Sequence, residues 1–122
     1  MGPERKLYQD LKKNTCSIIW NRIENLSLLG MPDVLGYNHS GKFFTVELKV
    51  AKGNKVNFSP HQIAFHLSHP KNTFILINAL GQRCVKLFPG SLVRDLSTEG
   101  HRTSWPLADS WSEIQKKFNQ VA

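Results

Sequence analysis

The sequence predicts one α/β domain in which helices flank a central β-sheet. Its 122 residues are 40% hydrophobic, an ordinary composition for a single globular domain that can bury a core. Runs rich in β-branched and aromatic residues alternate with segments that carry helix-capping sequences. The expected order is helix, three strands, helix, two strands, and then one or two helices, within a single domain over residues 1–122.

The first helix is expected over residues 3–14. Pro3 suits the first turn of a helix, where the N–H that it lacks has no partner anyway. Side chains that follow have the i, i+3, i+4, i+7 spacing of a helix face packed on a core. They are Glu4, Leu7, Tyr8 and Leu11.

Five runs are expected to be strands, because they combine β-branched, aromatic and apolar residues and are bounded by turn residues. They are residues 16–20, 33–37, 43–50, 73–78 and 84–88. A turn over residues 79–82, which contains Gly81, joins the last two.

A short helix is expected between Ser59 and Pro70. Ser59 and Gln62 have the spacing of a capping box, and Pro60 takes the first helical position. Toward the C-terminus, a loop is expected over residues 97–106.

A last helix is expected after that loop, because Ser110 and Glu113 have the spacing of a second capping box. The apolar side chains that follow share one helical face. They are Trp111, Ile114 and Phe118.

The strands on either side of Gly41 are expected to form a hairpin. Gly41 would supply the left-handed residue of a three-residue loop, so that Asn38 pairs with Lys42. The same register sets Asp33 directly opposite Glu47, with Cβ atoms about 5 Å apart. Two carboxylates would then face each other.

Lys49 is expected to join this pair. Side chains alternate along a strand, so Glu47 and Lys49 share one face, roughly 7 Å apart along it. The apolar side chains of the same strand point to the opposite face: Phe44, Val46, Leu48 and Val50.

Facing carboxylates destabilise a hairpin unless something offsets their repulsion. A divalent cation is the simplest such partner, and oxygen ligands at this separation suit Mg²⁺ or Mn²⁺, completed by water and a substrate phosphate. The alternative is that one acid lies outside the hairpin and that Lys49 pairs with the other in solvent, because a register slip of one residue would reverse a face. Glu4 lies on the helix stripe that faces the core, where a metal would partner its carboxylate. Its alternative is a first-turn acid that the helix dipole favours and that stays in solvent.

The charge of the chain points to a polyanionic partner. The net charge is +7 and the pI is near 9.7, which indicates nucleic acid or an anionic membrane surface. Between Val34 and Arg94, Glu47 is the only acid in the sequence. The basic residues of that stretch are Lys42, Lys49, Lys52, Lys55, Lys71, Arg83, Lys86 and Arg94. The alternative is that these charges only solvate the surface.

Residues 30–37, GMPDVLGY, followed by residues 43–50, FFTVELKV, resemble the PD-(D/E)XK nuclease superfamily. Its signature is Pro-Asp at one strand and acid-x-Lys on the next, and residues 47–49 supply the second half. Residues 3–13 are similar to the first helix of archaeal Holliday-junction resolvases, which carries a metal-associated Glu. Residues 54–67 resemble the basic strand and Gln-bearing helix of those resolvases. NRIEN before GMPD is also similar to phage-type VRR-NUC nucleases, and the likeness covers about residues 3 to 90.

The resemblance implies a restriction-endonuclease-like fold, with a mixed sheet flanked by helices in an α-β-β-β-α-β core. It implies that Asp33 and Glu47 bind a metal ion, with the Leu48 carbonyl as a third ligand. Lys49 would orient or deprotonate the attacking water, and Gln62 would support the site.

Glu4 would hold the metal directly or through water, and Glu24 is its rival for that role. Bound Mg²⁺ or Mn²⁺ activates water and stabilises the leaving oxygen of a phosphodiester, so such a site hydrolyses nucleic acid. Basic and polar side chains would hold the DNA backbone without reading its sequence. The expected DNA-binding residues are Lys12, Lys13, Arg22, Asn25, Lys42, Lys52, Lys55 and His61.

Three histidines stand close together in the second predicted helix. His61 and His66 are five residues apart and do not share a side of the helix, so a metal cluster is not expected. We expect these two and His69 to face DNA or solvent.

The tryptophan and cysteine side chains considered next are expected to have structural roles. Trp105 and Trp111 are expected to pack in the core or a dimer interface rather than to stack on bases. Cys16 and Cys84 lack CxxC spacing and are expected to be buried thiols.

The leading functional hypothesis is a metal-dependent DNA endonuclease that resolves Holliday junctions. A homodimer is expected, because a four-way junction offers two symmetric strands to cut. The alternatives are a nicking, homing or restriction-type endonuclease of the same fold, and a catalytically idle nucleic-acid-binding domain. No apolar run approaches the roughly 20 residues that cross a bilayer, so a cytoplasmic protein is expected in a bacterial, archaeal or phage-infected cell.

Overall fold

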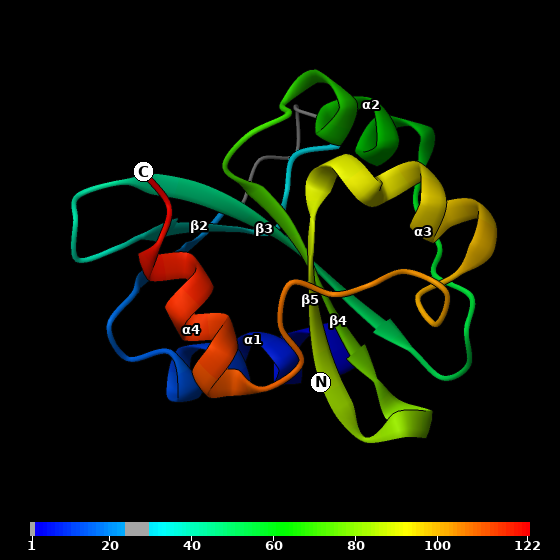
Figure 1. Ribbon diagram of the computed structural model, residues 1–122, viewed down its shortest axis with the longest axis horizontal. Helices are drawn as coiled ribbons and strands as arrows, with labels where there is room; N and C mark the ends of the chain where they lie inside the picture. Colours follow the sequence, from blue (N-terminus) through cyan, green and yellow to red (C-terminus); the bar gives the residue numbers. More distant parts are fainter. Residues whose placement is uncertain (1, 24–29) are drawn as a thin grey trace.

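A mixed sheet of five strands runs through the centre of the molecule, in the order β1-β2-β3-β4-β5 (Figure 1). Strands β1 to β3 form an antiparallel meander, β4 lies parallel to β3, and β5 returns antiparallel to β4. The computed structural model describes residues 2–23 and 30–122. The strands are β1 (Ile19–Arg22), β2 (Val34–Tyr37), β3 (Phe43–Ala51), β4 (Thr73–Ala79) and β5 (Cys84–Pro89).

Helices cover both faces of the sheet. Helix α1 (Pro3–Asn14) and helix α4 (Trp111–Asn119) lie together on one face, and α2 (Pro60–Ser68) and α3 (Val93–Glu99) lie on the other (Figure 1). Two short 3₁₀ helices flank β5: η1 (Leu80–Gln82) precedes it and η2 (Gly90–Leu92) follows it. In the part of the chain that the structure describes, no helix is long and apolar enough to cross a membrane.

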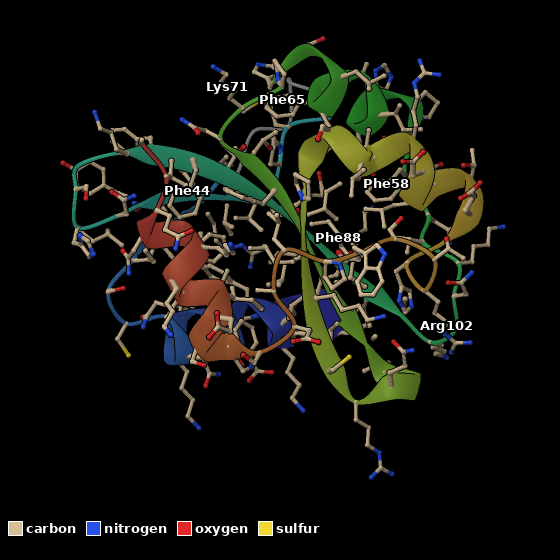
Figure 2. The ribbon with its side chains drawn as sticks, in the orientation of Figure 1. Phe44, Phe58, Phe65, Lys71, Phe88 and Arg102 are labelled. Carbon is tan, nitrogen blue, oxygen red and sulfur yellow. The ribbon has the colours of Figure 1, made fainter. Side chains whose placement is uncertain are left out.

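Because side chains alternate along the strands, each face of the sheet has its own apolar core. The core under α1 and α4 includes Leu7, Leu11, Phe44, Val46, Leu48, Leu76, Leu87, Ile114 and Phe118. The core under α2 and α3 includes Val56, Ile75, Ile77, Phe88, Val93 and Leu96, with Phe58 packed against it. Figure 2 shows this separation, with Phe44 beside α4 and with Phe58 and Phe88 on the side of α3.

Most of the predicted elements are confirmed. The order of helices and strands is as expected, and α1 has both of its predicted ends. The Ser59–Gln62 capping box forms in full at the start of α2. Of the second predicted box, at the start of α4, one bond forms, with the Ser110 hydroxyl accepting the Glu113 N–H.

Two predictions of secondary structure are wrong. The first strand begins at Ile19 rather than Cys16, because the chain turns after α1 and Thr15 is held by the Trp20 indole N–H at 2.9 Å. The loop predicted from residue 97 is helical up to Glu99. Helix α3 has no side-chain cap at its start and is stabilised by burial in the second core, so no local signal announces it.

Side chains outside the site correct further expectations. Cys16 is exposed and Cys84 is half-buried, so neither is the buried thiol that we expected. Trp105 is 90% exposed, which excludes core packing for it within this chain. Trp111 does pack against the first core.

Candidate active site

The hairpin between β2 and β3 has the predicted register. Val34 pairs with Val46, and the Asn38 N–H donates to the Lys42 carbonyl at 3.0 Å, so Asp33 comes opposite Glu47. Gly41 has a φ of 77°, the left-handed conformation expected in its three-residue loop.

The hairpin is anchored from the far end of the chain. The buried Asn38 side chain accepts the main-chain N–H groups of Ser40 and Lys42, each at 3.0 Å. Its Nδ2 donates to the carbonyls of Phe118, in the last turn of α4, and of Val121, just after that helix. The C-terminus therefore holds the loop that sets the register.

Asp33 lies where β2 begins, and its carboxylate crosses to β3. Its Oδ2 accepts the Leu48 N–H at 2.7 Å, and its carbonyl accepts the Ile23 N–H at 2.9 Å. A main-chain donor on each side thus fixes the acid. The loop before it is closely packed on α2, since a Cβ on Gly30 would lie 2.3 Å from the His61 carbonyl oxygen.

Glu47 is 1% exposed and projects from the centre of β3 toward α2. Its Oε2 accepts from Gln62 Nε2 at 3.3 Å, and the Lys49 ammonium donates to Gln62 Oε1 at 3.0 Å. Gln62 Oε1 also accepts the Ser59 N–H at 3.0 Å, so the amide that caps α2 also bridges Glu47 and Lys49. The capping box therefore fixes the orientation of the amide toward both side chains.

Glu4 approaches the same place from the start of α1. The residue is exposed and not pressed into the core as its stripe suggested, yet its surroundings desolvate it enough to raise the pKa of the carboxyl. The Asp33 charge raises that pKa further, and the Lys49 ammonium lowers it. The hollow of 310 Å³ beside it is lined by Gly2, Pro3, Glu4, Val50, Lys52 and Leu80.

Glu47 is the acid whose pKa is shifted most, and burial is the main cause. Burial, with the neighbouring Asp33 carboxyl adding to it, raises the pKa of Glu47 to about 9. Lys49 opposes these effects and Glu4 adds to them. Without a cation, the site holds a proton in place of a charge.

These residues fit a divalent cation. Glu47 Oε1 is buried and has no hydrogen-bond partner among the described residues, so one hard oxygen is free to bind it. Nowhere in residues 2–23 and 30–122 do three His, Cys, Asp or Glu side chains gather closely enough to form a metal cage. Asp33 and Glu47 would be side-chain ligands, Glu4 would hold the ion directly or through water, and the remaining positions would fall to the Leu48 carbonyl, to water and to substrate. Mg²⁺ commonly binds proteins with few side chains and several waters.

The expectation that His66 faces solvent or DNA is wrong. Its side chain is fully buried under α2, and its Nε2 lies 3.9 Å from Glu47 Oε1. His61 and His69 are exposed as expected. The signal that we missed is the spacing to Gln62, because residues four apart share a helix face and Gln62 was already assigned to the site.

The predicted DNA-binding side chains are exposed wherever the structure describes them, but they do not form one cluster. Lys52 lies in the same hollow as Glu4, whereas Lys12 and Lys13 end α1, at the opposite end of that helix. Lys12 and Arg22 both lie over the Tyr8 ring. Asn25 lies outside the described residues, as does Glu24, the rival of Glu4.

Comparison with known proteins places the fold. Neither a protein-family model nor a curated protein matches the chain. Among solved structures, the chain is similar to Hjc from Archaeoglobus fulgidus, a Holliday junction resolvase from an archaeal hyperthermophile. The TM-score is 0.62 and the identity 19%, over 92% of this chain and 96% of that one. The likeness confirms the predicted fold, a mixed sheet flanked by helices.

Proposed function

We propose that this chain is a Mg²⁺-dependent DNA endonuclease that resolves four-way junctions. The observation that carries the proposal is the convergence of Asp33, Glu47 and Lys49 at one edge of the hairpin, with Gln62 joining the last two. The raised pKa of Glu47 supports it, because a buried carboxyl beside two other acids is costly unless a cation binds there.

Each residue has a distinct task in hydrolysis. Mg²⁺ or Mn²⁺, when bound, supplies a nucleophilic water and stabilises charge on the phosphate. Asp33 and Glu47 provide negative oxygens for the cation, and the Leu48 N–H keeps Asp33 in place. Lys49, held by Gln62 Oε1 and by the Phe58 ring 5.0 Å from its ammonium, orients the attacking water.

The preference for junctions is supported by the fold and by charge. The similar solved structure is a Holliday junction resolvase, and the basic stretch from Val34 to Arg94 suits several DNA arms. We propose a homodimer, since two sites related by a two-fold axis match the two strands to be cut.

The test uses labelled four-way junction, linear duplex and single-stranded DNA, with and without Mg²⁺. The wild-type chain should cut the junction in a Mg²⁺-dependent manner, and Asp33→Asn should lower the rate about a thousand-fold or more, because several kcal/mol of transition-state stabilisation is lost. Asp95→Asn is the matched control, since Asp95 is exposed on α3 and should leave the rate unchanged.

Other results would redirect the proposal. Equal cutting of junction and duplex, or a strict monomer during cleavage, would favour a nicking or restriction-type enzyme. Binding of DNA without cleavage in either metal would favour an idle binding domain.

Lys49→Ala is a second test of the same site. Turnover should be abolished while the domain stays folded, because the ammonium bonds to Gln62 rather than packing among apolar side chains of the first core. Lys116→Ala, at an exposed position on α4, is the control. Loss of the folded state by thermal melting would make Lys49 structural and would contradict its assigned role.

A further inference from the structure

A chain of side-chain hydrogen bonds leads from the sheet into α2. Thr45 Oγ1 donates to Thr73 Oγ1 at 2.8 Å, and Thr73 Oγ1 lies 3.3 Å from His66 Nδ1. The Thr73 hydroxyl has a single hydrogen, and because it already accepts from Thr45, that hydrogen is directed at Nδ1. Nδ1 is then the acceptor, so the proton of the neutral ring sits on Nε2.

The protonated nitrogen faces the candidate metal ligand. Nε2 of His66 is 3.9 Å from Glu47 Oε1, and within the described residues neither of these buried atoms has a hydrogen-bond partner. A shift of about 1 Å would give an N–H···O bond of ordinary length. The other oxygen, Oε2, already accepts from Gln62 Nε2. Gln62 and His66, one turn apart on α2, thus lie next to the two oxygens of the Glu47 carboxylate, Oε2 and Oε1 respectively.

The surroundings of the imidazole restrict its orientation. A Cβ on Gly90 would lie 2.7 Å from His66 Nδ1 and 2.6 Å from Thr73 Cγ2, so only glycine leaves room there. The Phe65 ring stands edge-on to the imidazole, with centroids 5.6 Å apart. The His66 side chain is entirely buried, and a rotation of its ring would break the bond to Thr73.

We propose that His66 is a positioning residue for Glu47: its Nε2–H donates to Oε1 and orients the carboxylate for a divalent cation. Each carboxylate oxygen keeps a second lone pair for the cation. A neutral imidazole donates this bond without adding a charge of its own, so the full charge of Glu47 remains for the metal. The inference rests on the proposed function for the role of Glu47, and it extends that site by one residue.

The first experiment needs no metal and no DNA. Nitrogen-15 NMR of the imidazole in the metal-free chain at pH 10, where the Glu47 carboxyl with its pKa of about 9 is ionised, should show the Nε2–H tautomer of His66. Thr73→Val keeps the shape of the side chain but removes the hydroxyl, and it should abolish that preference. An Nδ1–H tautomer in the wild-type chain would overturn the proposal.

The second experiment measures Mn²⁺ affinity by titration of the metal-free chain, followed by electron paramagnetic resonance. His66→Gln places an amide nitrogen near the position of Nε2, whereas His66→Asn places one near Nδ1. The Asn variant should bind Mn²⁺ about 10-fold more weakly, in the range found for partners of metal ligands, and the Gln variant should stay close to wild type. His69→Gln is the control, since His69 is exposed on the same helix.

Rescue by Gln but not by Asn separates positioning from packing. Both variants are polar amides in one pocket, and thermal melting of each shows whether the domain stays folded. Equal Mn²⁺ affinity in the Gln, Asn and wild-type chains would overturn the proposal. In junction cleavage, the Asn variant should lower kcat and leave KM for DNA unchanged.

The outcomes also separate this inference from the proposed nuclease. If the wild-type chain cuts no DNA but binds Mn²⁺ in a manner that depends on His66, the nuclease fails and the positioning role stands. If it cuts DNA, while Thr73→Val leaves the His66 tautomer unchanged and the His66 variants leave Mn²⁺ affinity unchanged, the positioning role fails alone. A chain that binds no Mn²⁺ overturns both.

Discussion

Two buried histidines lie in opposite situations in this fold. Both His66 and His101 are at most 1% exposed. His101 has a partner for each nitrogen, with Nε2 2.8 Å from the Gly53 carbonyl and Nδ1 3.1 Å from the Lys86 ammonium. His66 has a partner at Nδ1 only, and its Nε2 faces Glu47 across a gap. A fully bonded side chain holds structure, whereas an unpaired buried atom facing a carboxylate points to a ligand that would complete the site.

His101 belongs to a structural clasp. The main-chain N–H of His101 donates to the Asn54 carbonyl at 3.0 Å, and Asn54 Nδ2 donates to the Glu99 carbonyl at 2.8 Å. The clasp ties the turn after β3 to the end of α3. That turn carries Lys52, and Lys55 follows, so His101 fixes a loop that we expect to contact DNA, while His66 fixes an acid.

The largest expected effect comes from the acid that His66 faces. Glu47→Gln should lower Mg²⁺-dependent cleavage about a thousand-fold or more, through loss of a charged ligand, and should leave DNA binding intact or tighter. His101→Gln, which lies in the clasp, should retain the same order of cleavage rate at saturating DNA. Rates are measured on the junction in single-turnover reactions. If the Glu47→Gln chain cuts at the parent rate, Glu47 is not a metal ligand, and His66 has no role in the site that distinguishes it from His101.

Two glycines sharpen the comparison further. Gly90→Ala should weaken Mn²⁺ binding about 10-fold, because its Cβ would displace His66 and Thr73. Gly100→Ala should instead lower the melting temperature with little change in Mn²⁺ affinity, since Gly100 has a φ of 85° and its Cβ would meet Asn54. Melting curves and metal titrations of both variants check this. If Gly90→Ala and Gly100→Ala lost Mn²⁺ affinity equally, the clasp around His101 would affect metal binding, and the proposed difference between the two histidines would be wrong.

A smaller effect concerns stability and pH in the absence of metal. The pKa of Glu47 is raised in the folded chain to about 9 from an ordinary value of 4.5, so the folded chain keeps a proton that the unfolded chain releases. Stability should therefore decline as pH rises from 4.5 toward 9, and Glu47→Gln should flatten that decline. Mg²⁺ should offset it in the wild-type chain alone. Urea unfolding at a series of pH values measures the slope, and an unchanged slope in the variant would refute the assignment.

The histidines act on the acid side of the same profile. Burial lowers the pKa of both, and for His66 the value falls to about 4 from 6.5. The folded chain resists protonation that the unfolded chain accepts, so stability is complete above pH 6.5 and is lost as pH falls below it. Between pH 4.5 and 6.5 the two effects have opposite signs and offset each other, so the slope due to Glu47 is read above pH 6.5, where the histidines no longer contribute.

Local signals were enough for the hairpin and for most of the site. Gly41 set the loop, the loop set the register, and the register brought Asp33 to Glu47, all within residues close in sequence. The Ser59–Gln62 capping box likewise placed the amide that joins Glu47 to Lys49. Short-range geometry therefore carried this part of the prediction.

The parts that sequence reasoning missed depend on distant contacts. Helix α3 has no cap and forms against an apolar core built by other segments. The partners of His101 come from Gly53 and Lys86, which no spacing rule connects. His66 is intermediate, since its spacing to Gln62 was visible, but its burial depends on Thr73 of the parallel neighbour strand and on Gly90.

The smallest expected effect tests the clasp through DNA binding. Lys52→Ala combined with Lys55→Ala should weaken junction and duplex binding alike and reduce the slope of log affinity against log salt by about 2, since each lost phosphate contact removes about 0.9. His101→Gln keeps both lysines but loosens the loop that carries them, so affinity should fall while the slope stays near the parent value. Fluorescence anisotropy over a salt series measures both quantities. If His101→Gln reduced the slope as much as the double lysine variant does, the histidine would act on phosphate contacts themselves, and its separation from the charged part of the interface would be lost.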